Sequence, residues 1–233
     1  MTNMVPPVGT PKRIGFISTR FHGTDGVTLE ARKWAQILEG MGHTCYWMAG
    51  QLDAPVERSY LAPLAFFNHP EVATLQSQLF GVPFRTRAIT NQIQKLKERL
   101  KDDLYHFIRK FNLEVLVPEN ILAIPMHVPL GLAMTEVIAE TPIPVIAHHH
   151  DFAWERERFT LNGVNDCLAA AFQPAFFAMD HVVINSMAQK ELARRLGIPS
   201  HIIPNILQFE TTPPGLDDYN SDLRREIGLR DDD

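Results

Sequence analysis

The sequence predicts an α/β fold, a Rossmann-like, doubly wound and mostly parallel sheet of about six strands. Two observations support this. Short apolar runs of strand length alternate with amphipathic stretches of helix length along most of the chain. The first such unit, at residues 14–49, is a strand, a glycine-containing turn, a helix and a strand, and a crossover of that kind makes its two strands parallel.

The first predicted elements form this βαβ unit. Residues 14–18 are a short apolar run of the kind found in a buried strand, and residues 45–49 form a second. Between them we predict a helix with its apolar side chains on one face: Trp34, Ile37, Leu38 and Met41. Residues 51–87 contain four spaced prolines, which break any long element there.

A long helix and several shorter elements follow. Over residues 88–112 apolar side chains recur every three or four positions and charged ones occupy the other face, which predicts an amphipathic helix. A buried strand is expected at residues 114–117. After it, predicted helices at residues 130–139, 165–172 and 187–196 alternate with predicted strands at residues 144–147, 181–184 and 201–203.

The chain divides into three predicted parts. Residues 1–12 are expected to be a flexible lead-in, and residues 13–206 the Rossmann-like domain. Residues 207–233 are expected to be an interdomain linker and the start of a missing C-terminal domain, because they include the linker-like run Thr-Thr-Pro-Pro-Gly. One short helix at residues 221–229, capped by Ser221, fits this tail.

The composition excludes several classes of protein. The chain carries 22 basic and 27 acidic residues, a formal net charge of -5, without a basic stripe, which argues against nucleic acid as a partner. The longest nearly uncharged run, residues 121–135, contains prolines and is too short for an integral membrane segment, which needs about 20 apolar residues. Two cysteines and no signal peptide favour a cytoplasmic location.

Ligands of open parallel sheets bind beyond the carboxyl ends of the strands, so polar residues there form the candidate site. Gly23 and Gly26 precede the first helix, whose unpaired amides favour a phosphate or carboxylate; alternatively, the two glycines only form a tight turn. Glu119 and Asn120 follow the strand at residues 114–117, and side chains of these types at a strand end can hydrogen-bond sugar hydroxyls. Alternatively, Asn120 caps a helix.

The densest polar cluster is at residues 148–158, HHHDFAWERER. Side-chain alternation along a strand separates His149 from its two neighbours, so the three histidines are not expected to face one ligand. A zinc site from His150, Asp151 and Glu155 matches no established ligand spacing, and no metal is predicted. The preferred interpretation is that Asp151 orients the His150 ring, while the two arginines of the cluster meet an anionic group.

Two more polar segments close predicted strands, Asn185-Ser186 and Pro204-Asn205. Helix capping is the default interpretation for Ser186. Asn205 directly precedes the predicted linker, and we expect it to contact whatever docks against that end of the sheet.

The order of these segments resembles the N-terminal half of a retaining glycosyltransferase of family 4, which has the GT-B fold. The resemblance extends over most of the chain, from Ile14 to Asn205. Its motifs are the strand at residues 14–18, the loop ending at Gly26-Val27, the helix closing on Gly42-His43, the strand end His150-Asp151, the run Val-Val-Ile-Asn-Ser at residues 182–186 and Ile-Pro-Asn at residues 203–205.

The resemblance implies a hexosyltransferase lobe that binds an acceptor and works with a second, donor-binding lobe. It implies a nucleotide-diphosphate sugar as donor substrate, a sugar, sugar acid or similar compound as acceptor, and no bound cofactor. His150 and Asp151 would be catalytic, and the loop with Gly23, Gly26 and Val27 would approach the donor diphosphate or an acceptor anion. Expected acceptor contacts are His22, Glu119, Asn120, His127, Trp154 and Arg156, while Ser186 and Asn205 would face the interdomain cleft.

The sequence departs from the family in two ways. Residues 23–26 read Gly-Thr-Asp-Gly rather than adjacent glycines, and the family's donor-binding half does not appear. We therefore expect no transfer by these 233 residues alone, and we expect the open docking face to favour a homodimer. Two alternatives stay open, a stand-alone sugar- or anion-binding module in the same cleft and a metal-dependent hydrolase that uses residues 148–155.

Overall fold

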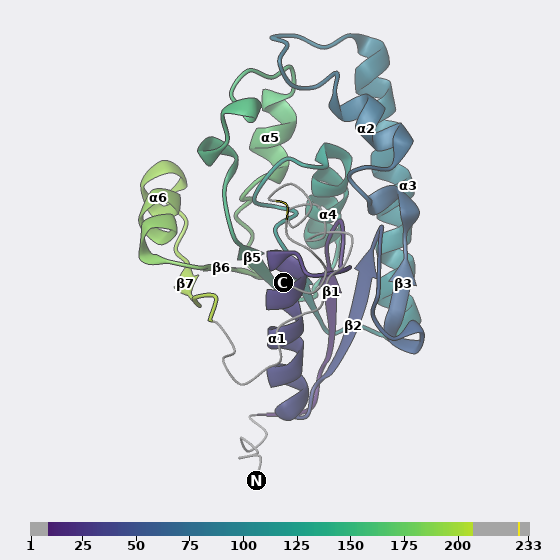
Figure 1. Ribbon diagram of the computed structural model, residues 1–233, viewed down its shortest axis with the longest axis vertical. Helices are drawn as coiled ribbons and strands as arrows, with labels where there is room; N and C mark the ends of the chain where they lie inside the picture. Colours follow the sequence, from purple (N-terminus) through teal and green to yellow (C-terminus); the bar gives the residue numbers. More distant parts are fainter. Residues whose placement is uncertain (1–8, 207–227, 229–233) are drawn as a thin grey trace.

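The computed structural model describes residues 9–206 and residue 228, and within them the predicted α/β fold is confirmed (Figure 1). Seven parallel strands in this part of the chain form one sheet in the order β3-β2-β1-β4-β5-β6-β7. They are β1 (Arg13–Ile17), β2 (Thr44–Ala49), β3 (Ser59–Leu61), β4 (Val115–Pro118), β5 (Val145–His149), β6 (Met179–Val183) and β7 (His201–Ile202). The strand order reverses between β1 and β4, which is where such sheets bind ligands.

Helices cover both faces of the sheet, as in a doubly wound fold (Figure 1). They are α1 (Gly26–Gly40), α2 (Pro70–Gln76), α3 (Arg87–Phe111), α4 (Val128–Glu140), α5 (Asn165–Ala171) and α6 (Ser186–Leu196). Helix α1 packs on one face with apolar residues of β1 and β2. Helices α3, α4 and α5 bury the larger core against the other face, and α6 packs beside β6 and β7.

Alternation along the strands divides side chains between these two cores. Phe16 and Trp47 point toward α1, where their rings stack with centroids 4.9 Å apart, whereas Ile17 and Met48 enter the core under α3. Gly15 permits the close approach of the chain around α3, because a Cβ there would lie 2.5 Å from Cδ1 of Leu113. The sequences of β1 and β2 are thus nearly continuous apolar runs, as expected for a sheet covered on both faces.

The structure corrects the predicted elements in one region. Residues 51–87, left unassigned, contain the edge strand β3, helix α2 and two short 3₁₀ turns, Val56–Arg58 and Pro63–Ala65. These elements were missed because each is too short to show a hydrophobic period, and β3 exists only through its pairing with β2. The sheet therefore has one strand more than the six expected. The helix expected at residues 221–229 lies outside the described residues.

Elsewhere the predicted helices and strands are confirmed, with ends displaced by one or two residues. One displacement concerns the site: β5 continues to His149 rather than ending at Ala147. None of the helices in the described part of the chain is long and apolar enough to cross a membrane.

Candidate functional site

A cleft of about 490 Å³ lies at the carboxyl ends of β1, β4 and β5, beside the first turn of α1. Segments that are far apart in the sequence line it: residues 18–20 after β1, residues 25–27 at the start of α1, residues 119–121 after β4 and residues 150–151 after β5. Asn205 also borders the cleft. This position coincides with the reversal of strand order, where the sequence placed the site.

Backbone hydrogen bonds fix the turn after β4 between two neighbouring strands. The Glu119 amide donates to the Ile17 carbonyl at 2.8 Å, and the Asn120 amide donates to the His148 carbonyl at 2.9 Å. Asn120 has a left-handed backbone with φ of 61°, which asparagine adopts more readily than most residues. The Glu119 side chain is thereby placed at the floor of the cleft, between β1 and β5.

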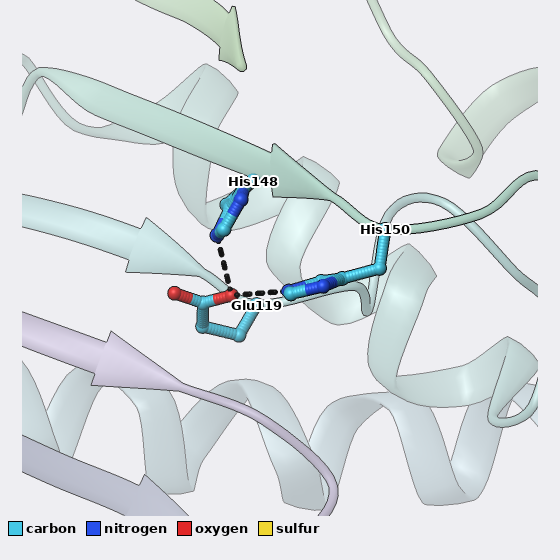
Figure 2. Close-up of side chains that lie close together, drawn as sticks. All are labelled: Glu119, His148 and His150. Carbon is cyan, nitrogen blue, oxygen red and sulfur yellow. Dashed lines mark hydrogen bonds and ion pairs between the residues drawn. The ribbon is translucent and has the colours of Figure 1, made fainter. Parts of the chain in front are cut away.

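Two histidines converge on one carboxylate oxygen of Glu119 (Figure 2). Nδ1 of His148 lies 2.9 Å and Nε2 of His150 lies 3.2 Å from Oε2 of Glu119. Glu119 and His148 are fully buried, whereas His150 is 11% exposed at its side chain and lines the cleft. His149 points to the opposite side of the strand and contacts His181, which confirms the separation predicted from strand alternation.

The carboxylate of Glu119 keeps its charge in spite of complete burial. Burial raises the pKa of a carboxyl group, but the charge of His148 and the hydrogen bonds from both histidines outweigh this effect and lower the pKa of Glu119. Its second oxygen, Oε1, has no hydrogen-bond partner among the described residues. Trp34 of α1 stacks on the His148 ring, with ring centroids 4.4 Å apart.

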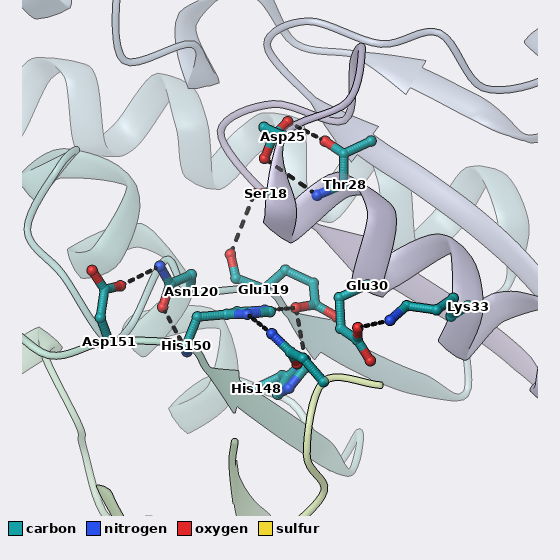
Figure 3. A network of polar contacts seen from close by, with 11 residues as sticks. Ser18, Asp25, Thr28, Glu30, Lys33, Glu119, Asn120, His148, His150 and Asp151 are labelled. Atoms are coloured by element: carbon teal, nitrogen blue, oxygen red, sulfur yellow. Dashed lines mark hydrogen bonds and ion pairs between the residues drawn. The ribbon is translucent and has the colours of Figure 1, made fainter. Parts of the chain in front are cut away.

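The sequence paired Asp151 with His150, and the structure corrects this (Figure 3). Oδ1 of Asp151 accepts a hydrogen bond from Nδ2 of Asn120 at 2.8 Å, and Oδ2 accepts one from Nε of Arg156 at 2.9 Å. The His150 ring is oriented by Glu119 instead. His150 and Asp151 lie in the bend after β5, where the two side chains have different partners.

The start of α1 borders the same cleft. Asp25 caps the helix by accepting a hydrogen bond from the Thr28 amide at 3.3 Å (Figure 3). It also pairs with Nε of Arg20 at 3.4 Å. Gly26 and Val27 occupy the first turn and line the cleft. Amides in a first helical turn lack intrahelical acceptors, and anion binding by Gly26 and Val27 stays a prediction.

The earlier part of that loop turns away from the cleft. The Gly23 amide donates to Oδ2 of Asp53 at 2.8 Å, and Asp53 also pairs with Arg32 of α1. Burial raises the pKa of Asp53, but these hydrogen bonds and the nearby charges of Arg32 and His22 lower it overall. Gly23 and His22 therefore belong to the turn and do not line the cleft. For Gly23 this agrees with the alternative in which the glycine only forms a tight turn.

His127 borders the cleft, but both nitrogens of its ring form hydrogen bonds with backbone atoms. Nε2 donates to the Leu64 carbonyl at 2.7 Å, and Nδ1 accepts from the Leu130 amide at 3.2 Å, which caps α4. Burial lowers the pKa of His127 to about 4. The ring is thus neutral near pH 7 and has no nitrogen left for the sugar contact that the sequence suggested.

Two other expected contacts also lie outside the cleft. Trp154 stacks on Phe152, with ring centroids 4.5 Å apart, and packs against the small apolar cluster under α6. Ser186 begins α6, but the capping oxygen belongs to Asn185, which accepts from the Ala188 amide at 2.8 Å. Both positions were judged from their neighbours in the sequence, which do not show which way a loop residue points.

The zinc set considered from the sequence is not assembled. Asp151 is bound to Asn120 and Arg156, and Oε2 of Glu155 accepts a hydrogen bond from the Phe152 amide at 2.8 Å. Sequence reasoning included His148 only in the metal-dependent hydrolase alternative and gave it no partner. The signal was present, because positions 148 and 150 share one side of a strand, but its partner lies 29 residues earlier in the chain.

No protein-family model matches the chain. The chain is similar to mannosylglucosylglycerate synthases. It is 30% identical over 220 residues to the enzyme of that name from Petrotoga mobilis and 31% identical over 221 residues to that from Thermotoga maritima. In both cases the match covers 93% of this chain and 50% of the relative, so the chain spans about half the length of the relatives it matches.

Proposed function

We propose that this chain is the acceptor-side lobe of a retaining, family 4-like glycosyltransferase with the GT-B fold. The similarity of 93% of the chain to two mannosylglucosylglycerate synthases carries this proposal. The product in their name combines two sugar units with a glycerate, and sugar transfer is the reaction that joins such units. The cleft at the reversal of strand order supports a substrate site in this half.

The proposed donor is a nucleotide-diphosphate hexose, and the proposed acceptor is a sugar acid or a glycoside of a small hydroxy acid. Three arginines at the cleft, Arg20, Arg156 and Arg158, favour an acceptor with a carboxylate, because guanidinium binds carboxylate with two parallel hydrogen bonds. Gly26 and Val27 supply first-turn amides of α1 for an anionic group of either substrate.

His150 is the residue of the cleft best placed to contact a transferred sugar. Because Glu119 is ionised, its contact with Nε2 of His150 keeps the proton on that nitrogen. Nδ1 then faces the side chain of Asn205, whose Nδ2 lies 3.4 Å away, and is available to accept a hydrogen bond from a sugar hydroxyl. Fixed donors around the leaving diphosphate would supply most of the rate acceleration.

Acceptor binding by the 233-residue chain tests the proposal directly. We expect calorimetry to show binding of a glycosylglycerate and weaker binding of the matched glycosylglycerol, which lacks the carboxylate. Equal binding of the two compounds would contradict an anionic acceptor. Absence of binding by both, in a chain shown to be folded by circular dichroism, would contradict the assignment of this lobe to the acceptor.

Transfer is best measured in a protein that carries this chain together with a second half like that of the relatives. We expect His150→Ala to lower kcat by about 100-fold or more, a typical loss when one preorganised polar contact to a transition state is removed. The control is His201→Ala on β7, an exposed histidine away from the cleft. Wild-type turnover in the His150 variant would refute the role of His150.

A further inference from the structure

Beneath the cleft, Glu119, His148 and His150 bring three donor atoms together. Nδ1 of His148, Nε2 of His150 and one carboxylate oxygen of Glu119 all lie within 4.8 Å of one another (Figure 2). The three side chains come from two neighbouring strand ends, held in register by the parallel bridge between Glu119 and His148. Rigid strands thus position the set, rather than a surface loop.

The distances from the Glu119 oxygen to the two histidine nitrogens match those between ligands around one metal ion. Metal–ligand bonds of about 2.1 Å that meet at roughly 90° to 110° place the donor atoms about 3.0–3.4 Å apart. The two distances from Oε2 of Glu119 to the histidine nitrogens are 2.9 Å and 3.2 Å. Two imidazoles and one carboxylate form a donor set that binds divalent transition metals and leaves further coordination positions open.

Charge and hydrogen bonding supply a second, independent argument. A fully buried carboxylate is costly unless charged or hydrogen-bonding partners compensate it, and the side-chain partners of Glu119 in the described part of the chain are two imidazoles, both at Oε2. Oε1 of Glu119 is buried without a hydrogen-bond partner among the described residues. A divalent ion would compensate the charge and offer Oε1 a ligand position.

We propose that Glu119, His148 and His150 form a binding site for one divalent first-row transition metal ion. With the ion bound, each imidazole carries its single proton on the nitrogen away from the metal, Nε2 in His148 and Nδ1 in His150. His150 then donates a hydrogen bond toward the cleft instead of accepting one. Glu119 and His150 both line the cleft, so an oxygen of a ligand bound there can complete the shell.

The site differs from the set considered from the sequence, and this difference gives the experiment its control. Asp151 and Glu155 flank the same strand end but hold Asn120, Arg156 and the Phe152 amide instead. Variants at these two carboxylates should leave metal binding unchanged, whereas Glu119→Gln removes a ligand and keeps the shape of the side chain.

The test is metal binding by the 233-residue chain after treatment with a chelator. Titration with Zn²⁺ by calorimetry and with Co²⁺ by visible absorption should show one equivalent of each ion. We expect Glu119→Gln and His150→Ala to weaken binding by about 100-fold or more, and Asp151→Asn and Glu155→Gln to change it less than about threefold. His150 lies at the cleft, so its variant keeps the test valid if Glu119→Gln does not fold.

Two results would overturn the proposal. In the first, the folded wild-type chain takes up less than a tenth of an equivalent of either ion. In the second, both ligand variants bind the ions as tightly as the wild type, which would locate the metal elsewhere. Neither result depends on the proposed glycosyltransferase function, because no sugar is present in the experiment.

Discussion

At the scale of single residues, neighbouring histidines of this chain have different roles because of where their rings lie. His150 borders the cleft, His148 is buried against Trp34, and His149 faces the other side of the strand. His127 lies at the cleft but acts as a helix cap. Residue type alone therefore does not separate a histidine that is open to the cleft from a structural one, whereas the partners of each ring nitrogen do.

His127 gives a prediction for the pH dependence of stability. Its pKa is lowered to about 4 by burial, with a smaller contribution from nearby His69, whereas in the unfolded chain the ring titrates near its ordinary value. Between these two values the unfolded state binds more protons, so folding stability falls as the pH decreases from about 6.5 to about 4. The full contribution of one such group is about 3 kcal/mol.

The matched variant is His127→Asn, which can still cap α4 but does not titrate. Chemical denaturation at a series of pH values should show a shallower fall in the free energy of unfolding for the variant than for the wild type. The slope should not vanish, because burial also lowers the pKa of His149 and His181. Parallel curves for the two proteins would show that His127 keeps an ordinary pKa in the folded state.

At the scale of elements, the residue after β2 packs closely against the segment that follows β3. This residue is Gly50; its amide donates to the Thr19 carbonyl at 3.1 Å, and it faces the backbone of Phe66. A Cβ at Gly50 would lie 1.9 Å from the nitrogen of Phe66. This contact brings the residues after β3 toward the cleft, where Phe67 forms part of the wall.

The variant Gly50→Ala should therefore be strongly destabilising. The clash is with backbone atoms, which cannot rotate aside, so we expect a loss of about 3 kcal/mol in the free energy of unfolding, at the upper end for overpacking. The control is Gly40→Ala at the end of α1, where a Cβ has open space and should be neutral or stabilising by up to about 1 kcal/mol. Similar urea midpoints for both variants would refute the close contact.

At the scale of the whole molecule, the two faces of one sheet carry separate apolar cores, and the cleft lies at the carboxyl ends of its strands. Cleft residues from β1, β4, β5 and α1 are brought together only when the complete sheet has formed. A ligand of this cleft would bind the folded state alone. Ligand binding and global stability are therefore linked.

This linkage predicts that the proposed acceptor stabilises the chain by itself. At a glycosylglycerate concentration 100 times its dissociation constant, the free energy of unfolding should rise by about 2.7 kcal/mol. Thermal unfolding with and without ligand measures the effect, and His150→Ala provides the comparison, since weaker binding reduces the shift at equal concentration. An unchanged midpoint in the wild type at all concentrations would contradict an acceptor site in this lobe.

The alternation of strands and helices was determined by the sequence alone, because hydrophobic period is a local property. The apolar run at residues 14–18 and the amphipathic pattern at residues 88–112 were sufficient for β1 and α3. The expected position of the candidate site at the strand ends followed from the parallel topology. Glu119 and His150 were therefore predicted as site residues from the sequence.

Only the tertiary structure decided which of these residues touch. Glu119 meets His148 and His150 because β4 and β5 pair in one particular register, and a shift by one residue would turn each side chain to the other face. The sequence assigned His150 to its neighbour Asp151, since adjacency along the chain is visible and strand register is not. Register is set by the packing of the whole sheet, so the buried Glu–His–His cluster could be seen only in the folded molecule.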